Sequence, residues 1–197
     1  MSEVWAIILA GGESKRMGSP KMLLPYRGAT IIETVIQNIA SSSVEKTLIV
    51  LGGDGDKILQ VISEYPVNHC YNAAYKSGML SSVKCGFAHL PDECLAAIVF
   101  PGDQPMIGAQ IINLVVRAWR ESGRAIVVPA FRGKRGHPVL IDRKYFKEIM
   151  TLNESEGLRA LALKYPGEVK EIETDNPLIL KDIDTEEDYR NEINRII

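Results

Sequence analysis

Residues 4–12 read VWAIILAGG. The apolar run at 4–9 is continuous instead of alternating with polar residues, which predicts a strand buried on both faces. The next residues, Ala10, Gly11 and Gly12, allow a tight loop at the end of that strand. A buried strand that enters a glycine loop in this way is typical of a parallel sheet covered by helices.

The same pattern recurs further along the chain. The sequence predicts strands at 47–51, 67–71, 96–100 and 125–129, and helices at 31–40, 80–90 and 111–120. Strands that alternate with helices in a βαβαβαβ order indicate an α/β fold. We therefore expect a three-layer α/β/α sandwich around a mostly parallel, Rossmann-like sheet.

The pattern changes after residue 129. The elements expected there are a turn at 131–134, a strand at 138–141, helices at 143–150, 158–164 and 186–197, and a strand at 169–172. We interpret 131–150 as an excursion over the carboxyl edge of the sheet, and Asp184-Thr185 as the cap of the last helix. With 46% hydrophobic residues, the 197-residue chain is expected to form one domain over 1–197.

Composition excludes several classes of protein. A formal charge of −2 provides no broad basic face for nucleic acid. No run reaches the roughly 18–20 apolar residues of a membrane helix, and the first residues enter a strand instead of a signal sequence. We therefore expect a cytoplasmic protein with neither membrane nor nucleic-acid partners. Cys70, Cys85 and Cys94 fit neither zinc-ligand nor C-x-x-C spacing, so reduced, packed thiols are expected.

The loop at 9–21, LAGGESKRMGSPK, combines exposed backbone N–H groups with the cations Lys15, Arg16 and Lys21. Such a loop suits a triphosphate, because both the backbone and the side chains favour an anion. It has neither the Walker spacing nor the G-x-G-x-x-G fingerprint. An ordinary glycine turn with solvated cations is the alternative interpretation.

The pattern LAGG-x-S-x-R-M-G-x-x-K resembles the signature of the MobA-like nucleotidyltransferases, the molybdenum cofactor cytidylyltransferases and guanylyltransferases. The resemblance implies the nucleotide-diphospho-sugar transferase fold. It also implies that Leu9, Ala10, Gly11 and Gly12 line the nucleotide. Arg16 and Lys21 would grip its phosphates, with Lys21 stabilising the charge that develops in catalysis.

Asp103 follows the predicted strand 96–100 in the turn Gly102-Asp103-Gln104-Pro105. Ligands of open α/β sheets bind at the carboxyl ends of strands, and phosphate transfer requires a hard cation that a carboxylate can hold. Simple turn chemistry is the alternative. The GDQP form resembles the metal motif of the cytidylyltransferase branch, which implies that Asp103 takes part in catalysis and binds Mg²⁺.

Near the end of the chain, Asp182 and Asp184 lie on one side of an extended segment before the last helix. Either aspartate could complete a metal site, and Asp184 could instead cap the helix. The string DIDTEED resembles the D-x-D-T-x-E-D ending of these transferases. That resemblance ranks Asp184 above Asp182 as the second metal ligand.

Two further segments are candidates for substrate binding. Asn72, Gly78, Ser81 and Ser82 form an unusually polar strand-to-helix connection that could hold ribose and base, or could be an ordinary capped helix. The pattern N-x-x-x-x-x-G-M-x-x-S resembles the cytidylyltransferases. The basic segment Arg135-Gly136-His137-Pro138 resembles the family's R-G-x-P-V segment, which implies acceptor binding, and a solvated hairpin is its alternative.

Taken together, the resemblance implies Mg²⁺-dependent transfer of a nucleoside monophosphate, expected to be CMP from CTP, to molybdopterin with release of pyrophosphate. GTP is the alternative donor, because LAGG is more typical of guanylyltransferases and 153–157 replaces a G-D-x-G segment. Other phosphorylated acceptors, or a non-catalytic carrier of the cofactor, are the alternative functions. A client molybdoenzyme is a candidate partner.

Overall fold

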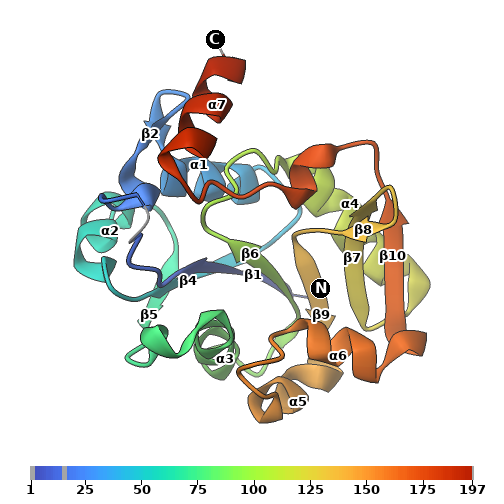
Figure 1. Cartoon of the computed structure of the whole chain (residues 1–197). Helices are drawn as coiled ribbons and strands as arrows, with labels where there is room; N and C mark the ends of the chain where they lie inside the picture. The colour runs from blue at the N-terminus through green and yellow to red at the C-terminus, as the bar shows by residue number, and fades with distance from the viewer. Residues whose placement is uncertain (1–2, 15–16, 197) are drawn as a thin grey trace.

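The computed structural model describes residues 3–14 and 17–196. Within them, one eight-stranded sheet has the order β10-β7-β9-β6-β1-β4-β5, with β8 paired to β7 (Figure 1). The strands are β1 (Glu3–Ala10), β4 (Lys46–Leu51), β5 (Asn68–Tyr71), β6 (Cys94–Pro101), β7 (Ile126–Phe131), β8 (Lys134–Arg135), β9 (Val139–Asp142) and β10 (Val169–Glu173). The strands predicted from the apolar runs are all present.

Helices cover both faces of this sheet. They are α1 (Ile31–Ala40), α2 (Gly55–Ile62), α3 (Met79–Ala88), α4 (Ala109–Ser122), α5 (Phe146–Thr151), α6 (Arg159–Lys164) and α7 (Glu186–Ile196). In Figure 1, α3, α5 and α6 lie on one side of the sheet, and α1, α2 and α4 lie on the other. The three-layer α/β/α prediction is therefore confirmed.

Strand β1 shows why the layers form. Val4, Ala6 and Ile8 are buried in the core beneath α1, α2 and α4, whereas Ile7 and Leu9 are buried in the core beneath α3, α5 and α6. Successive side chains of a strand point to opposite faces, so a continuous apolar strand requires cover on both sides.

The interpretation of 131–150 as an excursion over the carboxyl edge is wrong for its strand. β9 lies within the sheet and pairs antiparallel with both β6 and β7. Its residues Leu140 and Ile141 are at most 1% exposed. An apolar strand of this kind is more stable between two neighbours than over an edge, and it runs antiparallel because the chain reverses after β7.

The elements that were not predicted include one helix and one hairpin. α2 (GDKILQVI) spans eight residues, so the alternating part of the chain has one more helix and strand than the expected βαβαβαβ order. A small hairpin joins β2 (Pro25–Tyr26) to β3 (Ala29–Thr30) ahead of α1. Both are short, which leaves little periodicity for a sequence pattern to detect.

The start of α7 is fixed by a reciprocal cap. The Thr185 hydroxyl accepts from the Asp188 backbone N–H at 3.1 Å, and the Asp188 carboxylate accepts from the Thr185 backbone N–H at 2.9 Å. Of the predicted pair Asp184-Thr185, these bonds assign the cap to Thr185. Every helix within 3–14 and 17–196 is too short or too polar to cross a membrane.

Candidate nucleotide and metal site

The centre of the site is set by the parallel pairing of β1 and β6. Leu9 lies opposite Pro101, and the Gly102 N–H donates to the Leu9 carbonyl at 3.0 Å. A Cβ on Gly102 would lie only 2.9 Å from that carbonyl oxygen, so glycine is needed for this close approach. The glycine loop after β1 and Asp103 after β6 therefore leave the same edge of the sheet.

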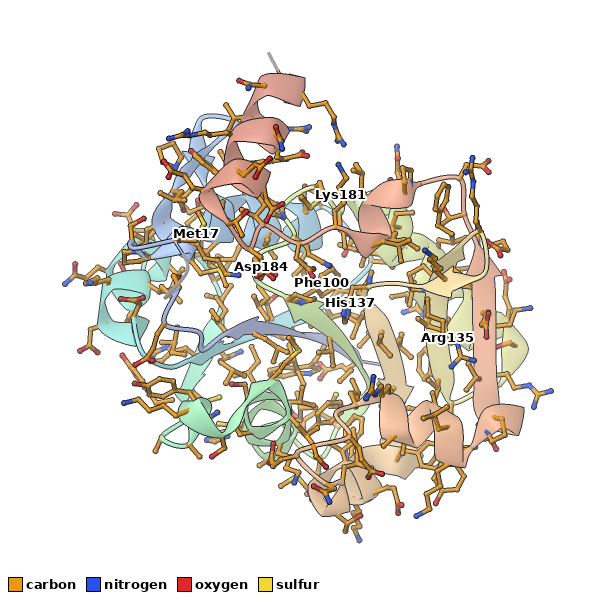
Figure 2. All side chains as sticks on the ribbon, in the orientation of Figure 1. Met17, Phe100, Arg135, His137, Lys181 and Asp184 are labelled. Carbon is orange, nitrogen blue, oxygen red and sulfur yellow. The ribbon has the colours of Figure 1, made fainter. Side chains whose placement is uncertain are left out.

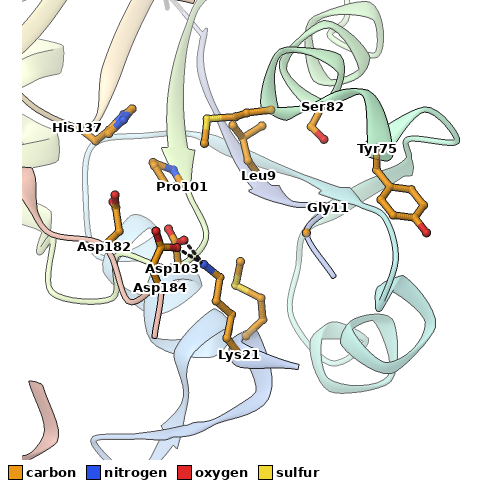
Figure 3. Close-up of a pocket in the computed structure, with 14 residues that line it drawn as sticks. Leu9, Gly11, Lys21, Tyr75, Ser82, Pro101, Asp103, His137, Asp182 and Asp184 are labelled. Carbon is orange, nitrogen blue, oxygen red and sulfur yellow. Dashed lines mark hydrogen bonds and ion pairs between the residues drawn. The ribbon is translucent and has the colours of Figure 1, made fainter. Parts of the chain in front are cut away.

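Lys21 connects the loop to two distant acids (Figure 3). Its Nζ donates to Asp103 Oδ2, to Asp184 Oδ1 at 3.0 Å and to the Ile183 carbonyl at 3.2 Å. The Lys21 backbone N–H also donates to Ser14 Oγ at 3.0 Å, which anchors the lysine to the loop. Because both carboxylates bind one nitrogen, their oxygens lie within a few ångströms of each other.

Burial and charge shift the protonation of these groups. Burial raises the pKa of Asp103 above its ordinary value, and this outweighs the opposing effect of the nearby Lys21 ammonium. Burial lowers the pKa of Lys21, but the carboxylates of Asp103 and Asp184 more than offset it, so the net shift is upward. Lys21 is therefore held as a cation.

Asp182 adds a third acid to this cavity. The Gln104 amide Nε2 donates to Asp182 Oδ1, so the residue after Asp103 positions the residue two before Asp184. Asp103, Asp182 and Asp184 all line a cavity of about 320 Å³ together with Lys21. Among the described residues, the Lys21 ammonium group and three carboxyl groups thus line the same cavity.

This donor set fits a hard divalent cation. Asp103 Oδ1 is buried and has no hydrogen-bond partner, so it retains an unsatisfied acceptor. Carboxylate oxygens are the ligands that such cations prefer. In the described part of the chain, however, the three-residue cluster closed tightly enough for a metal is Cys70, Cys85 and His89, not the three aspartates. A cation here would therefore need substrate oxygens or water to complete its coordination.

The structure brings most of the predicted nucleotide residues to this cavity. Its full lining is Leu9, Gly11, Gly12, Lys21, Met22, Tyr75, Gly78, Met79, Ser82, Pro101, Asp103, His137, Asp182 and Asp184. Ala10 is fully buried in β1 and does not line it. The predicted phosphate ligand Arg16, like Lys15, lies outside the described residues.

Asn72 and Ser81 are buried behind the cavity wall. Asn72 Nδ2 donates to Ser81 Oγ at 2.8 Å and to Ser82 Oγ at 3.0 Å, and Asn72 Oδ1 accepts from the Ala74 N–H. This amide therefore fixes the first turn of α3 and aims Ser82 into the cavity. Its neighbourhood also accounts for Gly11, because a Cβ there would lie 2.8 Å from Ser82 Oγ.

Sequence reasoning missed four lining residues: Met22, Tyr75, Met79 and Pro101. The Tyr75 hydroxyl donates to Glu13 Oε1 at 3.0 Å, which links the polar connection before α3 to the glycine loop. Tyr75 and Met79 stand inside the polar segment that the sequence had already marked. Their proximity to that segment was the available signal.

A second cavity of about 460 Å³ adjoins the first and shares Met79 and His137 with it. Of the predicted acceptor residues, Arg135, Gly136 and His137 line it, whereas Pro138 is buried and does not. In Figure 2, His137 lies between Asp184 and Arg135. Gly136 is confined because a Cβ there would lie 2.3 Å from the Ile179 carbonyl oxygen.

His137 and Arg135 differ in their charge state and in their contacts. Burial lowers the pKa of His137, which favours the neutral imidazole, and its Nδ1 is buried without a hydrogen-bond partner. Arg135 is exposed and pairs with Glu171, with the shorter N–O distance at 2.6 Å. His137 therefore faces both cavities, whereas Arg135 stands at the outer rim of the second.

A mostly parallel α/β sheet with a glycine loop, a lysine and carboxylates at one edge fits a nucleotidyltransferase. Residues 6–169 match the model of the MobA-like NTP transferase domain, and the chain belongs to that family. It is 28% identical over 190 residues to the molybdenum cofactor cytidylyltransferase of Escherichia coli (strain K12), covering 96% of this chain and 95% of the relative.

Other similarities extend over most of the chain. It is 30% identical to the nicotine blue oxidoreductase of Paenarthrobacter nicotinovorans, covering 95% of each protein. A nucleotidyl transferase from Methanothermobacter thermautotroptrophicus superposes with a TM-score of 0.84 over 100% of both chains at 20% identity. The last similarity shows the shared fold.

Proposed function

We propose that this enzyme transfers CMP from CTP to the terminal phosphate of molybdopterin and releases pyrophosphate, with GMP from GTP as the alternative. The observation that carries the proposal is the ion-paired set of Lys21, Asp103 and Asp184 at the end of the glycine loop. The full-length similarity to a molybdenum cofactor cytidylyltransferase supports the choice of acceptor. A molybdoenzyme would then receive the product.

The chemistry requires charge neutralisation and positioning more than it requires a protein nucleophile, because the acceptor phosphate is already anionic. Asp103 and Asp184, with Asp182 beside them, would hold Mg²⁺, which supplies charge neutralisation at the phosphates when bound. Lys21 would exchange a carboxylate partner for a phosphate oxygen when the nucleotide enters. Its ammonium then stabilises the charge that develops as pyrophosphate leaves.

The second cavity is the proposed binding site of the acceptor. Leu80, Ile126, Val128 and Val139 give it apolar walls, which suit an uncharged ring system. The phosphate arm of such an acceptor would pass between Met79 and His137, the residues common to both cavities. Gly136 and His137 would line this passage, Arg135 would lie at its outer rim, and Pro138 would support the loop from behind.

The LAGG loop, which is more typical of guanylyltransferases, faces Ser82 through Gly11. Alanine in place of Gly11 would press against the Ser82 hydroxyl, because the added Cβ would lie 2.8 Å from Ser82 Oγ. Gly11 therefore provides the space that the Ser82 hydroxyl occupies. The proposal of CTP therefore rests on the GDQP motif and the cytidylyltransferase relative, and GTP must be tested beside it.

One relative of similar coverage is named an oxidoreductase. The observation that favours nucleotidyl transfer is the lysine and carboxylate set beside a glycine loop, since these groups bind phosphate and a hard cation. A redox role would not need that set at the phosphate position.

The proposal is tested by pyrophosphate release on mixing the protein with Mg²⁺, molybdopterin and either CTP or GTP. We expect release with one nucleotide to exceed release with the other by at least about tenfold, the margin that base-edge hydrogen bonds can supply. Sugar phosphates and isoprenoid precursor phosphates serve as competing acceptors. Binding of nucleotide and molybdopterin without pyrophosphate release would instead identify a carrier.

A further inference from the structure

Cys70 in β5 and Cys85 in α3 lie against each other. Their Sγ atoms are 3.7 Å apart, which is contact distance for two unbonded sulfurs, and both thiols are free. A disulfide has an S–S length of about 2.05 Å, so bond formation needs only a small approach of the two side chains. The fold thus pairs two thiols that are 15 residues apart in sequence.

The two thiols differ in accessibility. Cys70 is 5% exposed, and burial raises its pKa to about 12, so it is poorly ionised and protected from reagents. Cys85 is partly exposed, and its Sγ lies 4.0 Å from the Nδ1 of the exposed His89. An accessible sulfur beside a buried one is the arrangement in which the first is oxidised and the second resolves it.

This thiol pair connects the two segments that form the nucleotide wall. Cys70 precedes Asn72 by two residues, and Cys85 follows Ser82 by three, which is about one helical turn. The Asn72 amide already joins β5 to α3 through its bonds to Ser81 and Ser82. A covalent bond between the cysteines would act on the same junction.

We propose that Cys70 and Cys85 form a reversible disulfide in response to a peroxide, and that this bond weakens nucleotide binding at the neighbouring wall. The peroxide oxygen is transferred to Cys85 Sγ as the O–O bond breaks, giving a sulfenic acid and one water. Cys70 Sγ then attacks Cys85 Sγ, and the sulfenic oxygen leaves as a second water with the Cys70 proton. Two thiols lose two electrons, and one hydrogen peroxide becomes two waters.

The direction of the effect follows from the sheet order. β5 is the edge strand beyond β4, whereas the glycine loop leaves β1 on the other side of β4. We infer that bond formation draws α3 toward β5 and so shifts Ser82, three residues before Cys85, relative to Gly11, which it closely faces in the reduced protein. Misplacement of a group in an active site by about 1 Å can lower the reaction rate by about 100-fold. We expect the oxidised protein to bind nucleotide roughly tenfold more weakly.

The first test is covalent and does not depend on the proposed function. The full chain is treated with hydrogen peroxide, and its intact mass and peptide map are recorded before and after reduction with dithiothreitol. We expect loss of two hydrogens, a Cys70–Cys85 cross-linked peptide and full reversal on reduction. Separate sulfinic or sulfonic acids on the two cysteines would overturn the proposal. So would a stoichiometric zinc ion on the Cys70, Cys85 and His89 cluster that blocks oxidation.

The second test measures the dissociation constants of CTP and GTP with MgCl₂ for the oxidised and reduced protein. The Cys85→Ser variant should retain the reduced-state affinity after peroxide treatment, whereas Cys94→Ser, which leaves the pair intact, should respond as the native chain does. Equal affinities in the cross-linked and reduced native protein would refute the effect on the site. If the reduced protein binds neither nucleotide, the proposed function fails while the mass test still decides the disulfide.

Discussion

Lys21 and Asp103, which are 82 residues apart in the chain, form an ion pair at the edge of the sheet where β1 and β6 end. Both side chains are largely buried, at 12% and 15% exposed, so the pair occupies the wall of the cavity and not the molecular surface. The carboxylate of Asp184 completes the arrangement from the opposite end of the sequence. This relationship gives the first predictions.

Replacing Asp103 with asparagine should lower the turnover of the proposed transfer by at least about 100-fold, because it removes a charge that positions the cation and Lys21. The fold should persist, since the amide is isosteric. Turnover is measured by pyrophosphate release, and folding by circular dichroism. Asp92→Asn, at a fully exposed acid, is the matched control. Near-native turnover in Asp103→Asn would remove this role.

Lys21→Ala should make thermal stability depend on divalent cations. Without the ammonium group, Asp103 and Asp184 lose the cation that they share in the native chain. Mg²⁺ should then raise the melting temperature of Lys21→Ala more than that of the native chain. Differential scanning calorimetry with MgCl₂ and with EDTA measures the shift, and exposed Lys57→Ala is the control. An equal shift in both proteins would contradict the shared position of lysine and metal.

Asp184→Asn should weaken Mn²⁺ binding more than Asp182→Asn does. Asp184 shares a bound ammonium group with Asp103, whereas Asp182 accepts a hydrogen bond from the Gln104 amide. Mn²⁺ affinity in the presence of the preferred NTP can be followed by electron paramagnetic resonance. A larger loss in Asp182→Asn would reverse the order of the two aspartates.

Gly52→Ala should disturb the nucleotide loop. A Cβ at this position would lie 2.3 Å from the Gly11 carbonyl oxygen and 2.7 Å from its Cα, so backbone must move. We expect the dissociation constant for NTP to rise by about tenfold or more. Gly167→Ala is the control, since its added Cβ would contact nothing within 4 Å. Unchanged NTP affinity in Gly52→Ala would show that the loop adapts freely.

Because of His137, the free energy of unfolding should decrease at acid pH. Burial holds its pKa below the ordinary value of 6.5, so the unfolded chain binds the proton more readily than the folded chain. The contribution of the neutral ring is complete above that value and decreases as the pH falls through it toward the folded pKa. Urea unfolding in EDTA at about pH 7.5 and about pH 5.5 measures the difference. The decrease should be smaller in His137→Gln and unchanged in exposed His69→Gln.

The sequence by itself determined the alternating core of this protein. Continuous apolar runs such as 4–9 require burial on both faces, and helical spacing such as that of 111–120 supplies the cover, so local patterns were sufficient for the three-layer fold. The resemblance to a family motif was not needed to see that the glycine loop and Asp103 follow buried strands. Because the glycine loop and Asp103 each follow a buried strand, their positions indicated the carboxyl edge of the sheet for both.

Only the tertiary structure decided which segments and side chains contact one another. The insertion of β9 between β6 and β7, the Lys21 ammonium shared by Asp103 and Asp184, and the contact of Cys70 with Cys85 all join different elements of the fold. The physical reason is that local pattern fixes whether a segment is a strand or helix and which face is buried. The neighbour it packs against is selected by the free energy of the whole assembled core.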